Sequence, residues 1–112
     1  MDELATLKIE DRDGASIVHL AGEIDISNAD SIMERIVEEL ATSRRDVIDL
    51  SAVTYLDSTG VRMLVTLAAR ANARDSTLHV VVPDDAAIRR ILTLVDLSRF
   101  ATFHEAVADA LA

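Results

Sequence analysis

Segments with strand-like and helix-like hydrophobic periodicity alternate along this chain, and that alternation restricts the fold more than any other feature. The run TLHVVV (77–82) is almost wholly apolar, which is typical of a strand covered on both faces, and DVIDL (46–50) is another short strand pattern. Helical patterns cover 27–40, a segment that starts near Ser58, and 84–95. Helices between successive strands are the usual crossovers between parallel strands, so the sequence predicts an α/β fold with helices flanking a sheet.

The first part of the chain predicts an antiparallel hairpin. Residues 4–10 alternate between apolar and polar side chains, with Ala5, Leu7 and Ile9 on one face. The turn sequence DRDG ends at Gly14, and ASIVHLAG (15–22) follows as a second strand. We therefore expect a mixed sheet of four to five strands, antiparallel in this hairpin and largely parallel afterwards, with about four helices.

Finer features of the helices are predicted from the same patterns. Ser27 is the expected N-cap of the first helix. Leu94, Val95 and Leu97 are interpreted as core and loop packing rather than partner surface. The helix over 84–95 is expected to bury Ile88, Ile91, Leu92 and Val95. A short strand at 99–103 and a last helix over 104–112, with Ala106, Val107, Ala110 and Leu111 inward, complete the order ββαβαβαβα.

Composition narrows the class of protein. The 112 residues suit one domain, 1–112, and the absence of cysteine excludes disulfides and thiolate metal sites. The net charge of −9 argues against nucleic acid and against anionic membrane surfaces. No apolar run is long enough for a transmembrane helix, and the acidic N-terminus is unlike a signal peptide. We expect a cytoplasmic protein with no cofactor, no bound metal and no membrane insertion.

The tetrad DSTG, residues 57–60, is the most distinctive polar motif. Asp57 is placed at the N-cap of a helix, with Ser58, Thr59 and Gly60 in the first turn. In the simpler interpretation the tetrad only caps the helix. In the functional one, it presents a hydroxyl at a helix N-terminus, which favours a phosphate, and after a strand end, where α/β sheets place their sites.

Enzyme classes fit the sequence poorly. A nucleophile elbow needs glycine two residues before the serine, where this chain has Leu56. A phosphate-binding loop of the Walker type is absent. A response-regulator receiver needs a lysine late in the chain, and Lys8 is the only lysine.

Three segments together resemble the STAS domain family, and within it the anti-sigma-factor antagonists. They are AGEIDISNAD, VIDLSAVTYLDSTGVRMLV and VVVPDDAAIRRILTLVDL, and the resemblance covers about residues 4–111. It implies a small mixed sheet with flanking helices and no catalysis of its own. It also implies that the unmodified chain binds an anti-sigma factor that is a serine kinase, so that the sigma factor is released. The kinase then phosphorylates the serine of the tetrad, and a serine phosphatase resets the chain.

The resemblance assigns roles to particular residues. Ser58 matches the phosphoacceptor, with Thr59 a second and less favoured acceptor. Asp57 and Asp25 match the acids beside it, and Gly60 matches the turn glycine. The expected partner surface adds the loop residues Ile26, Ser27 and Asn28. Arg62 stands where many relatives carry something small; it is either a solvated helix residue or a contact to the partner or the phosphate.

A different use of the same family fold stays open. Some STAS domains are scaffold subunits of lipid-transport machinery or of larger signalling assemblies, and they dock without being phosphorylated. The intact serine in DSTG favours the switch over this alternative.

Overall fold

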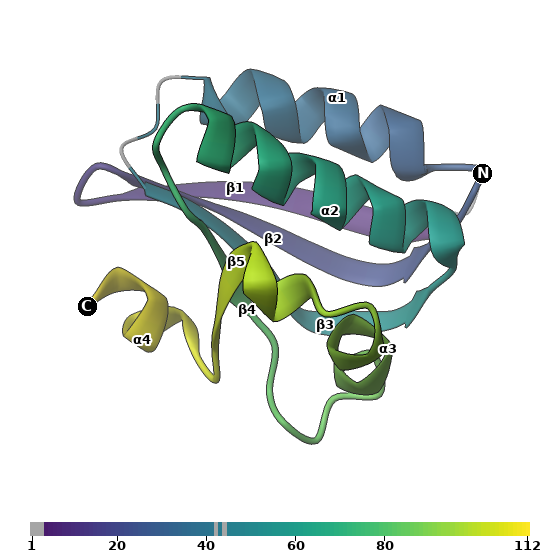
Figure 1. Cartoon of the computed structure of the whole chain (residues 1–112). Coiled ribbons are helices and arrows are strands. Elements are labelled where there is room, and N and C mark those ends of the chain that lie inside the picture. The colour runs from purple at the N-terminus through teal and green to yellow at the C-terminus, as the bar shows by residue number, and fades with distance from the viewer. Residues whose placement is uncertain (1–3, 42, 44) are drawn as a thin grey trace.

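A five-stranded mixed sheet forms the centre of the protein. The structure, a computed structural model, describes residues 4–41, 43 and 45–112. The strand order is β1-β2-β3-β4-β5; β1 and β2 are antiparallel and every later neighbouring pair is parallel (Figure 1). The predicted fold class and element order are confirmed. The elements are β1 (Ala5–Arg12), β2 (Ala15–Ile24), α1 (Ala29–Leu40), β3 (Arg45–Leu56), α2 (Ser58–Ala73), β4 (Leu78–Val81), α3 (Arg89–Leu94), the 3-10 helix η1 (Leu97–Arg99), β5 (Ala101–His104) and α4 (Val107–Leu111).

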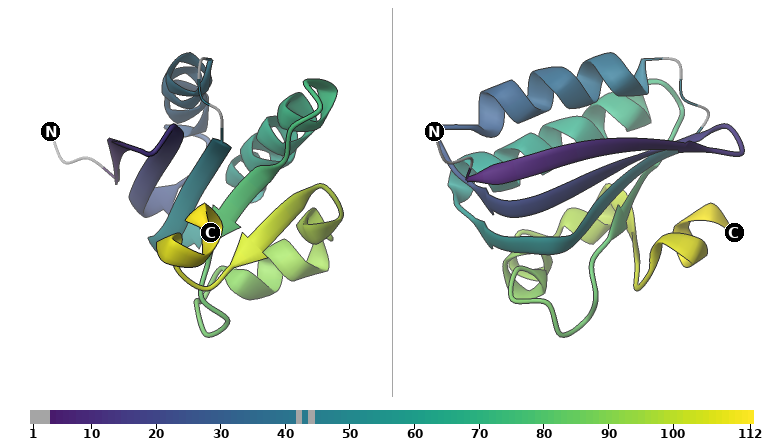
Figure 2. Two further views of the ribbon diagram at one scale, coloured as in Figure 1. Left: turned by 90° about the vertical axis from the view of Figure 1, so that its left-hand side faces the viewer. Right: turned by 180° about the vertical axis from the view of Figure 1, so that it is seen from behind.

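The helices cover the two faces of the sheet unequally. The helices α1 and α2 lie side by side over the face formed by β1, β2 and β3 (Figures 1 and 2). Val18 and Ile48 point into the large aliphatic core beneath them, and Leu92 of α3 joins that core. Alternate residues such as Ile17 and Val47 point the other way, into a smaller cluster closed by α4. Sheet residues therefore alternate between two cores, as the period of a strand requires.

The hairpin and its register agree with the sequence pattern. Ala5, Leu7 and Ile9 are half-buried against the large core, and Thr6 and Lys8 between them are exposed. Asp13 and Gly14 both have positive φ, 52° and 85°, which is the conformation of a two-residue turn whose twist matches the strands.

Two predictions about β3 and α1 were wrong. The strand runs to Leu56 rather than ending at residue 50, because it pairs with β2 as far as Ile24. Register shifts in that pairing expose both Ser51 and Ala52, so the apolar alternation that marks a strand is lost there. The helix α1 begins at Ala29, and its N-cap position is taken by Asn28 rather than Ser27.

The C-terminal helices are shorter than predicted. Turns after Pro83 replace the first part of the expected helix, and α3 covers only Arg89–Leu94. Ile88 and Leu97 are buried as predicted, whereas Leu94 is 73% exposed and Val95 is 42% exposed, contrary to the prediction. The helix ends before Asp96, whose left-handed φ of 60° turns the chain into η1.

The last strand is confirmed as Ala101–His104, close to the predicted 99–103. The last helix begins only at Val107, because the extended backbone of Ala106 precedes it, and Ala106 is exposed rather than inward. Ala110 is fully buried and closes the smaller core.

Candidate functional site

The tetrad DSTG lies where two parallel strands end. Asp57 follows β3 directly, has extended backbone, and is the N-cap of α2, as predicted. Its N–H donates to the carbonyl of Ile24, the last residue of β2, at 3.2 Å. The start of α2 is therefore fixed to the carboxyl ends of β2 and β3, which is where open α/β sheets place their sites.

The Asp57 carboxylate holds two segments at once. Its Oδ1 accepts hydrogen bonds from the N–H groups of Thr59 (2.9 Å) and Gly60 (3.1 Å), and also from the Thr59 hydroxyl. Its Oδ2 accepts from the N–H of Ile26 at 3.0 Å. One side chain thus caps α2 and fastens the loop between β2 and α1 to it.

These donors also set the protonation of Asp57. The hydrogen bond from the Thr59 hydroxyl, helped by the N–H groups of Gly60, Ile26 and Thr59, holds the pKa of Asp57 below its ordinary value, although desolvation acts in the opposite direction. Each of these donors stabilises the charged carboxylate. The cap is therefore an anion at neutral pH.

Gly60 allows the close approach of α2 to the sheet. A Cβ added at this position would lie 2.9 Å from Leu56 Cδ2 and 3.2 Å from the carbonyl oxygen of Ile24. Gly60 is buried, so it contributes to the site by packing rather than by contact with a partner.

The loop that carries Asp25 is held by its own side chains. Asp25 Oδ1 accepts from the N–H of Ser27 at 2.9 Å and from the Ser27 hydroxyl. Asn28 Oδ1 accepts from the N–H of Asp25 at 2.9 Å, while Asn28 Nδ2 donates to the carbonyl of Glu23 at 2.9 Å. The loop is thus ordered internally, and Ile26 projects from it with 80% of its surface exposed.

The two hydroxyls of the tetrad differ in availability. Ser58 is exposed, and its hydroxyl makes no hydrogen bond to any residue that the structure describes. The Thr59 side chain is half-buried and its hydroxyl is bound to Asp57. Ser58 is the freely presented hydroxyl of the pair.

No histidine is arranged to activate either hydroxyl within the described part of the chain. His19 bonds Asp49 and Glu10 on the opposite face of the sheet, at 2.7 and 2.9 Å. His79 Nδ1 and His104 Nε2 face each other at 2.9 Å on β4 and β5.

A groove of about 430 Å³ lies between α1 and α2 beside the tetrad. Arg62 is exposed on its α2 side and forms no ion pair with a described residue. The residues that line the groove are Ile26, Ala29, Asp30, Met33, Thr59, Arg62, Met63 and Thr66. Exposed Ile26, unpaired Arg62 and the Ser58 hydroxyl thus belong to one end of the molecule.

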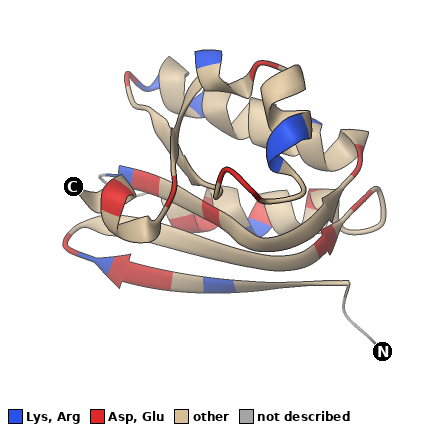
Figure 3. Ribbon diagram, turned by 90° about the horizontal axis from the view of Figure 1, so that it is seen from below, with Lys and Arg blue, Asp and Glu red and all other residues tan. Residues whose placement is uncertain are grey.

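Within residues 4–41, 43 and 45–112, no helix is long and apolar enough to span a bilayer. In the same residues, no group of three or more His, Cys, Asp or Glu side chains is placed to hold a metal ion. Acidic and basic residues are interspersed on β1 and its neighbours rather than separated by sign (Figure 3).

Comparison with known proteins identifies the family. The model of the STAS domain matches residues 6–110. The chain belongs to the STAS domain family. This STAS domain is 32% identical over 107 residues to the anti-sigma-F factor antagonist RsfB of Mycobacterium tuberculosis, covering 91% of this chain and 86% of RsfB.

Solved structures agree with that assignment. An anti-sigma factor antagonist from Mycobacterium paratuberculosis superposes with a TM-score of 0.85 at 32% identity, covering 96% of this chain and 91% of the other. Unphosphorylated SpoIIAA, an anti-sigma factor antagonist, has a TM-score of 0.73 at 16% identity, covering 95% of this chain and 93% of its own, and so shares the fold. The resemblance to anti-sigma-factor antagonists is confirmed.

The structure brings the predicted residues together at one end of the sheet and adds others. The bond from Ile26 to Asp57 joins residues 31 positions apart, and no local pattern indicates it. Met33 and Met63 line the groove only because α1 and α2 pack side by side, which also leaves no signal in the sequence.

Proposed function

We propose that this STAS domain is an anti-sigma-factor antagonist that is switched off by phosphorylation of Ser58. The observation that carries the proposal is the exposed, unbonded hydroxyl of Ser58 in the first turn of α2. A protein kinase needs an accessible hydroxyl on a locally ordered backbone, and the Asp57 cap orders this one. The names of the relatives, RsfB and the M. paratuberculosis antagonist, support the antagonist function.

In the unmodified state the chain binds an anti-sigma factor that is also a serine kinase, and the sigma factor is released. Ile26, the groove between α1 and α2, and Arg62 supply the contact surface. Arginine and methionine are enriched in interfaces, and Arg62, Met33 and Met63 line this groove. A serine phosphatase returns the modified chain to this state. Sigma factors act in the cytoplasm, so the proposal places the chain there.

Phosphorylation changes charge more than structure. A phosphate adds about −1.5 to −2 charges at pH 7. The N-terminus of α2 favours the anion by roughly 0.3–1 kcal/mol, while the neighbouring Asp57 carboxylate repels it. Because these effects oppose each other, the fold of the free chain stays nearly the same.

The interface responds differently to the same phosphate. A partner surface that covers Ser58 must desolvate the dianion or place its own charges against it, which costs several kcal/mol. A loss of about 4 kcal/mol weakens binding roughly 1,000-fold. The modification therefore acts as an interface switch, and the protein needs no catalytic residues of its own.

Thr59 remains the second choice of acceptor. Its hydroxyl donates to Asp57, so phosphorylation there would remove that hydrogen bond and place a dianion directly against the capping carboxylate. A phosphate on Ser58 is also repelled by Asp57, but it removes no hydrogen bond of the cap.

The alternative is a scaffold STAS domain that docks without phosphorylation, in lipid-transport machinery or a signalling assembly. The Ile26 surface suits such docking equally well, and the free Ser58 hydroxyl is the feature that favours the switch.

The deciding experiment is phosphorylation by the cognate kinase. The full chain is incubated with the anti-sigma factor and Mg-ATP, and the phosphorylated residue is mapped by mass spectrometry. Phosphate on Ser58, together with release of the kinase, is expected. A stable complex without phosphate on Ser58 or Thr59 would instead support the scaffold.

A further inference from the structure

The outer edge of the sheet is an open strand. β1 pairs with β2 on one side only, and it has no neighbour on the other side among the described residues. The carbonyl of Leu4 accepts from the N–H of Glu23 at 2.9 Å, which marks that pair as hydrogen-bonded. Hydrogen-bonded and non-hydrogen-bonded pairs alternate in an antiparallel ladder. Starting from Leu4, every second residue of β1 therefore bonds β2, and the residues between them, Ala5, Leu7 and Ile9, point their amide and carbonyl groups away from β2 toward the open edge.

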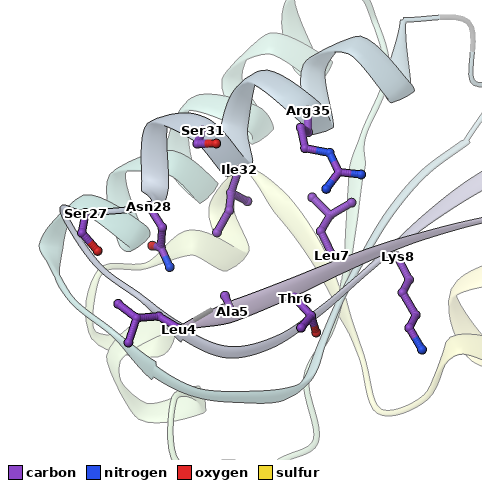
Figure 4. A pocket seen from close by; sticks show the side chains of 10 residues that line it. All are labelled: Leu4, Ala5, Thr6, Leu7, Lys8, Ser27, Asn28, Ser31, Ile32 and Arg35. Carbon is purple, nitrogen blue, oxygen red and sulfur yellow. The ribbon is translucent and has the colours of Figure 1, made fainter. Parts of the chain in front are cut away.

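A groove of about 720 Å³ runs beside this edge, between β1 and α1. Leu7 and Ile32 point into the gap, and Arg35 reaches from α1 toward Leu7, whereas Lys8 points to the other side of the strand (Figure 4). The complete lining is Leu4, Ala5, Thr6, Leu7, Lys8, Ser27, Asn28, Ser31, Ile32 and Arg35.

The charge of this groove is opposite to that of the chain. Its lining residues include no carboxylate and two cations, Arg35 on the groove side and Lys8 on the other side of β1, although the whole chain has a net charge of −9. Neither cation forms an ion pair with a described residue. The groove is therefore suited to an occupant with carboxylates and with aliphatic side chains for Leu7 and Ile32.

We propose that the groove binds an acidic, aliphatic-rich segment of another protein, which adds to β1 as a sixth strand. The outward amide and carbonyl groups of Ala5, Leu7 and Ile9 bind its backbone. Because side chains of a strand alternate in direction, its aliphatic residues enter the groove over Leu7 while the residues between them lie on the Lys8 side. Acidic residues there pair with Lys8, and a carboxylate at the rim pairs with Arg35.

A second copy of this chain is a poorer occupant. A second copy offers two edge strands, β5 and β1: the four residues of β5 contain no carboxylate, and in β1 Lys8 and Arg12 accompany Glu10 and Asp11. Such a mixed strand places cations as well as acids against Lys8 and Arg35.

This groove shares Ser27 and Asn28 with the partner surface expected from the sequence, but it does not include the residues that carry the proposed switch. Ser58, Thr59 and Arg62 are not part of its lining. Phosphorylation of Ser58 therefore leaves the binding of the acidic segment unchanged, and this inference stands or falls separately from the proposed function.

The test uses amide NMR spectra of the ¹⁵N-labelled full chain with a blocked peptide that alternates glutamate and valine over seven residues. We expect saturable shifts and slower hydrogen exchange at the amides of Ala5, Leu7 and Ile9. A matched peptide of lysine and valine should leave them unchanged. Arg35→Glu should weaken binding at least tenfold, whereas Arg70→Glu, an equal charge reversal on exposed α2 surface, should bind as the original chain does.

Several results would overturn the proposal. One is the absence of shifts in β1 at millimolar peptide, and another is an equal loss of affinity in Arg35→Glu and Arg70→Glu. A third is the appearance of the same β1 shifts when the chain is concentrated without peptide, which would identify a second copy as the occupant.

Discussion

The Asp57 carboxylate binds the backbone N–H of Ile26 at 3.0 Å, across 31 positions of sequence. The same carboxylate caps α2 through the N–H groups of Thr59 and Gly60. The exposed Ile26 and the helix turn that presents Ser58 are therefore held in a fixed relation by one side chain, which makes them parts of a single surface.

Replacement of Asp57 by asparagine should loosen this surface and destabilise α2. An amide keeps one oxygen for the cap but presents N–H groups, not an acceptor, to Ile26 or to the helix. We expect Tm to fall by roughly 4–8 °C, because the oxygen that caps α2 is kept but one acceptor is lost, an effect of about 1 kcal/mol, and we expect a large shift of the Ile26 amide resonance. Asp85→Asn, an exposed acid in the turn before α3, is the control and should leave both unchanged.

The histidines should give opposite pH dependences of stability. Burial lowers the pKa of His19, but the hydrogen bonds and charges of Glu10 and Asp49 outweigh it and raise the pKa above 6.5. A raised pKa contributes stability that is complete below the unfolded pKa of about 6.5 and is lost as pH rises through the folded value. Burial, with Arg45 and His104 nearby, lowers the pKa of His79, so its effect is a loss of stability as pH falls below about 6.5.

Urea unfolding of His19→Asn and His79→Asn between pH 5 and 8 checks these signs. The stability difference between the original chain and His19→Asn should shrink as pH rises, and the difference for His79→Asn should grow. If the two stability differences changed with pH in the same direction, the assignment of the carboxylate cluster to His19 and of the burial effect to His79 would be contradicted.

Much of the fold follows from local pattern, and the parts that do not follow depend on tertiary contacts. Hydrophobic periodicity and capping residues predict the hairpin, the crossover helices and the Asp57 cap, and the structure confirms them. The length of β3 was not predictable, because register shifts against β2 erase its alternation. Leu94 and Val95 fit the spacing of a helix that was predicted over 84–95. The chain forms turns after Pro83 and at Asp96, which shorten that helix, and both side chains are exposed.

Within the site, too, local features could be predicted and long-range contacts could not. The positions of Asp57, Ser58 and Gly60 at the cap and in the first turn of α2 follow from their spacing, because a cap and a first turn are local. Ser27 was wrongly chosen as a cap because both Ser27 and Asn28 are good capping residues; the structure uses Ser27 to bond Asp25 instead. The Ile26–Asp57 bond and the groove between α1 and α2 depend on how distant elements meet.

Substitutions of Ser58 should separate binding from folding. Ser58→Ala should retain affinity for the anti-sigma factor and resist phosphorylation, because the hydroxyl makes no bond within the described chain. Ser58→Asp should bind at least tenfold more weakly while its Tm stays within a few degrees, because one carboxylate carries about half the charge of a phosphate. Calorimetric titration and thermal melts measure the two effects. Equal affinities for the two variants would refute the charge mechanism.

Gly60→Ala should destabilise the chain even though alanine is the better helix former. The added Cβ meets Leu56 Cδ2 at 2.9 Å and the Ile24 carbonyl oxygen at 3.2 Å, so α2 must move away from the sheet. Overpacking of this kind costs about 1–3 kcal/mol, against a helix-propensity gain of roughly 1 kcal/mol. Urea denaturation should show a net loss of stability. A stabilised Gly60→Ala would indicate that Leu56 moves aside without cost.

Ile26→Ser should weaken partner binding without affecting the fold. Ile26 is 80% exposed and its backbone, not its side chain, bonds Asp57, so the stability should stay within about 0.5 kcal/mol. A side chain that is fully desolvated near the centre of an interface can cost more than 1 kcal/mol when truncated, and the proposal places Ile26 there, so binding to the anti-sigma factor should fall about tenfold. Leu94→Ser provides the matched control, because Leu94 is 73% exposed on α3 and is outside the groove beside the tetrad. If Leu94→Ser weakens binding and Ile26→Ser does not, the partner surface lies over α3 and the end of the sheet at Ser58 is not its centre.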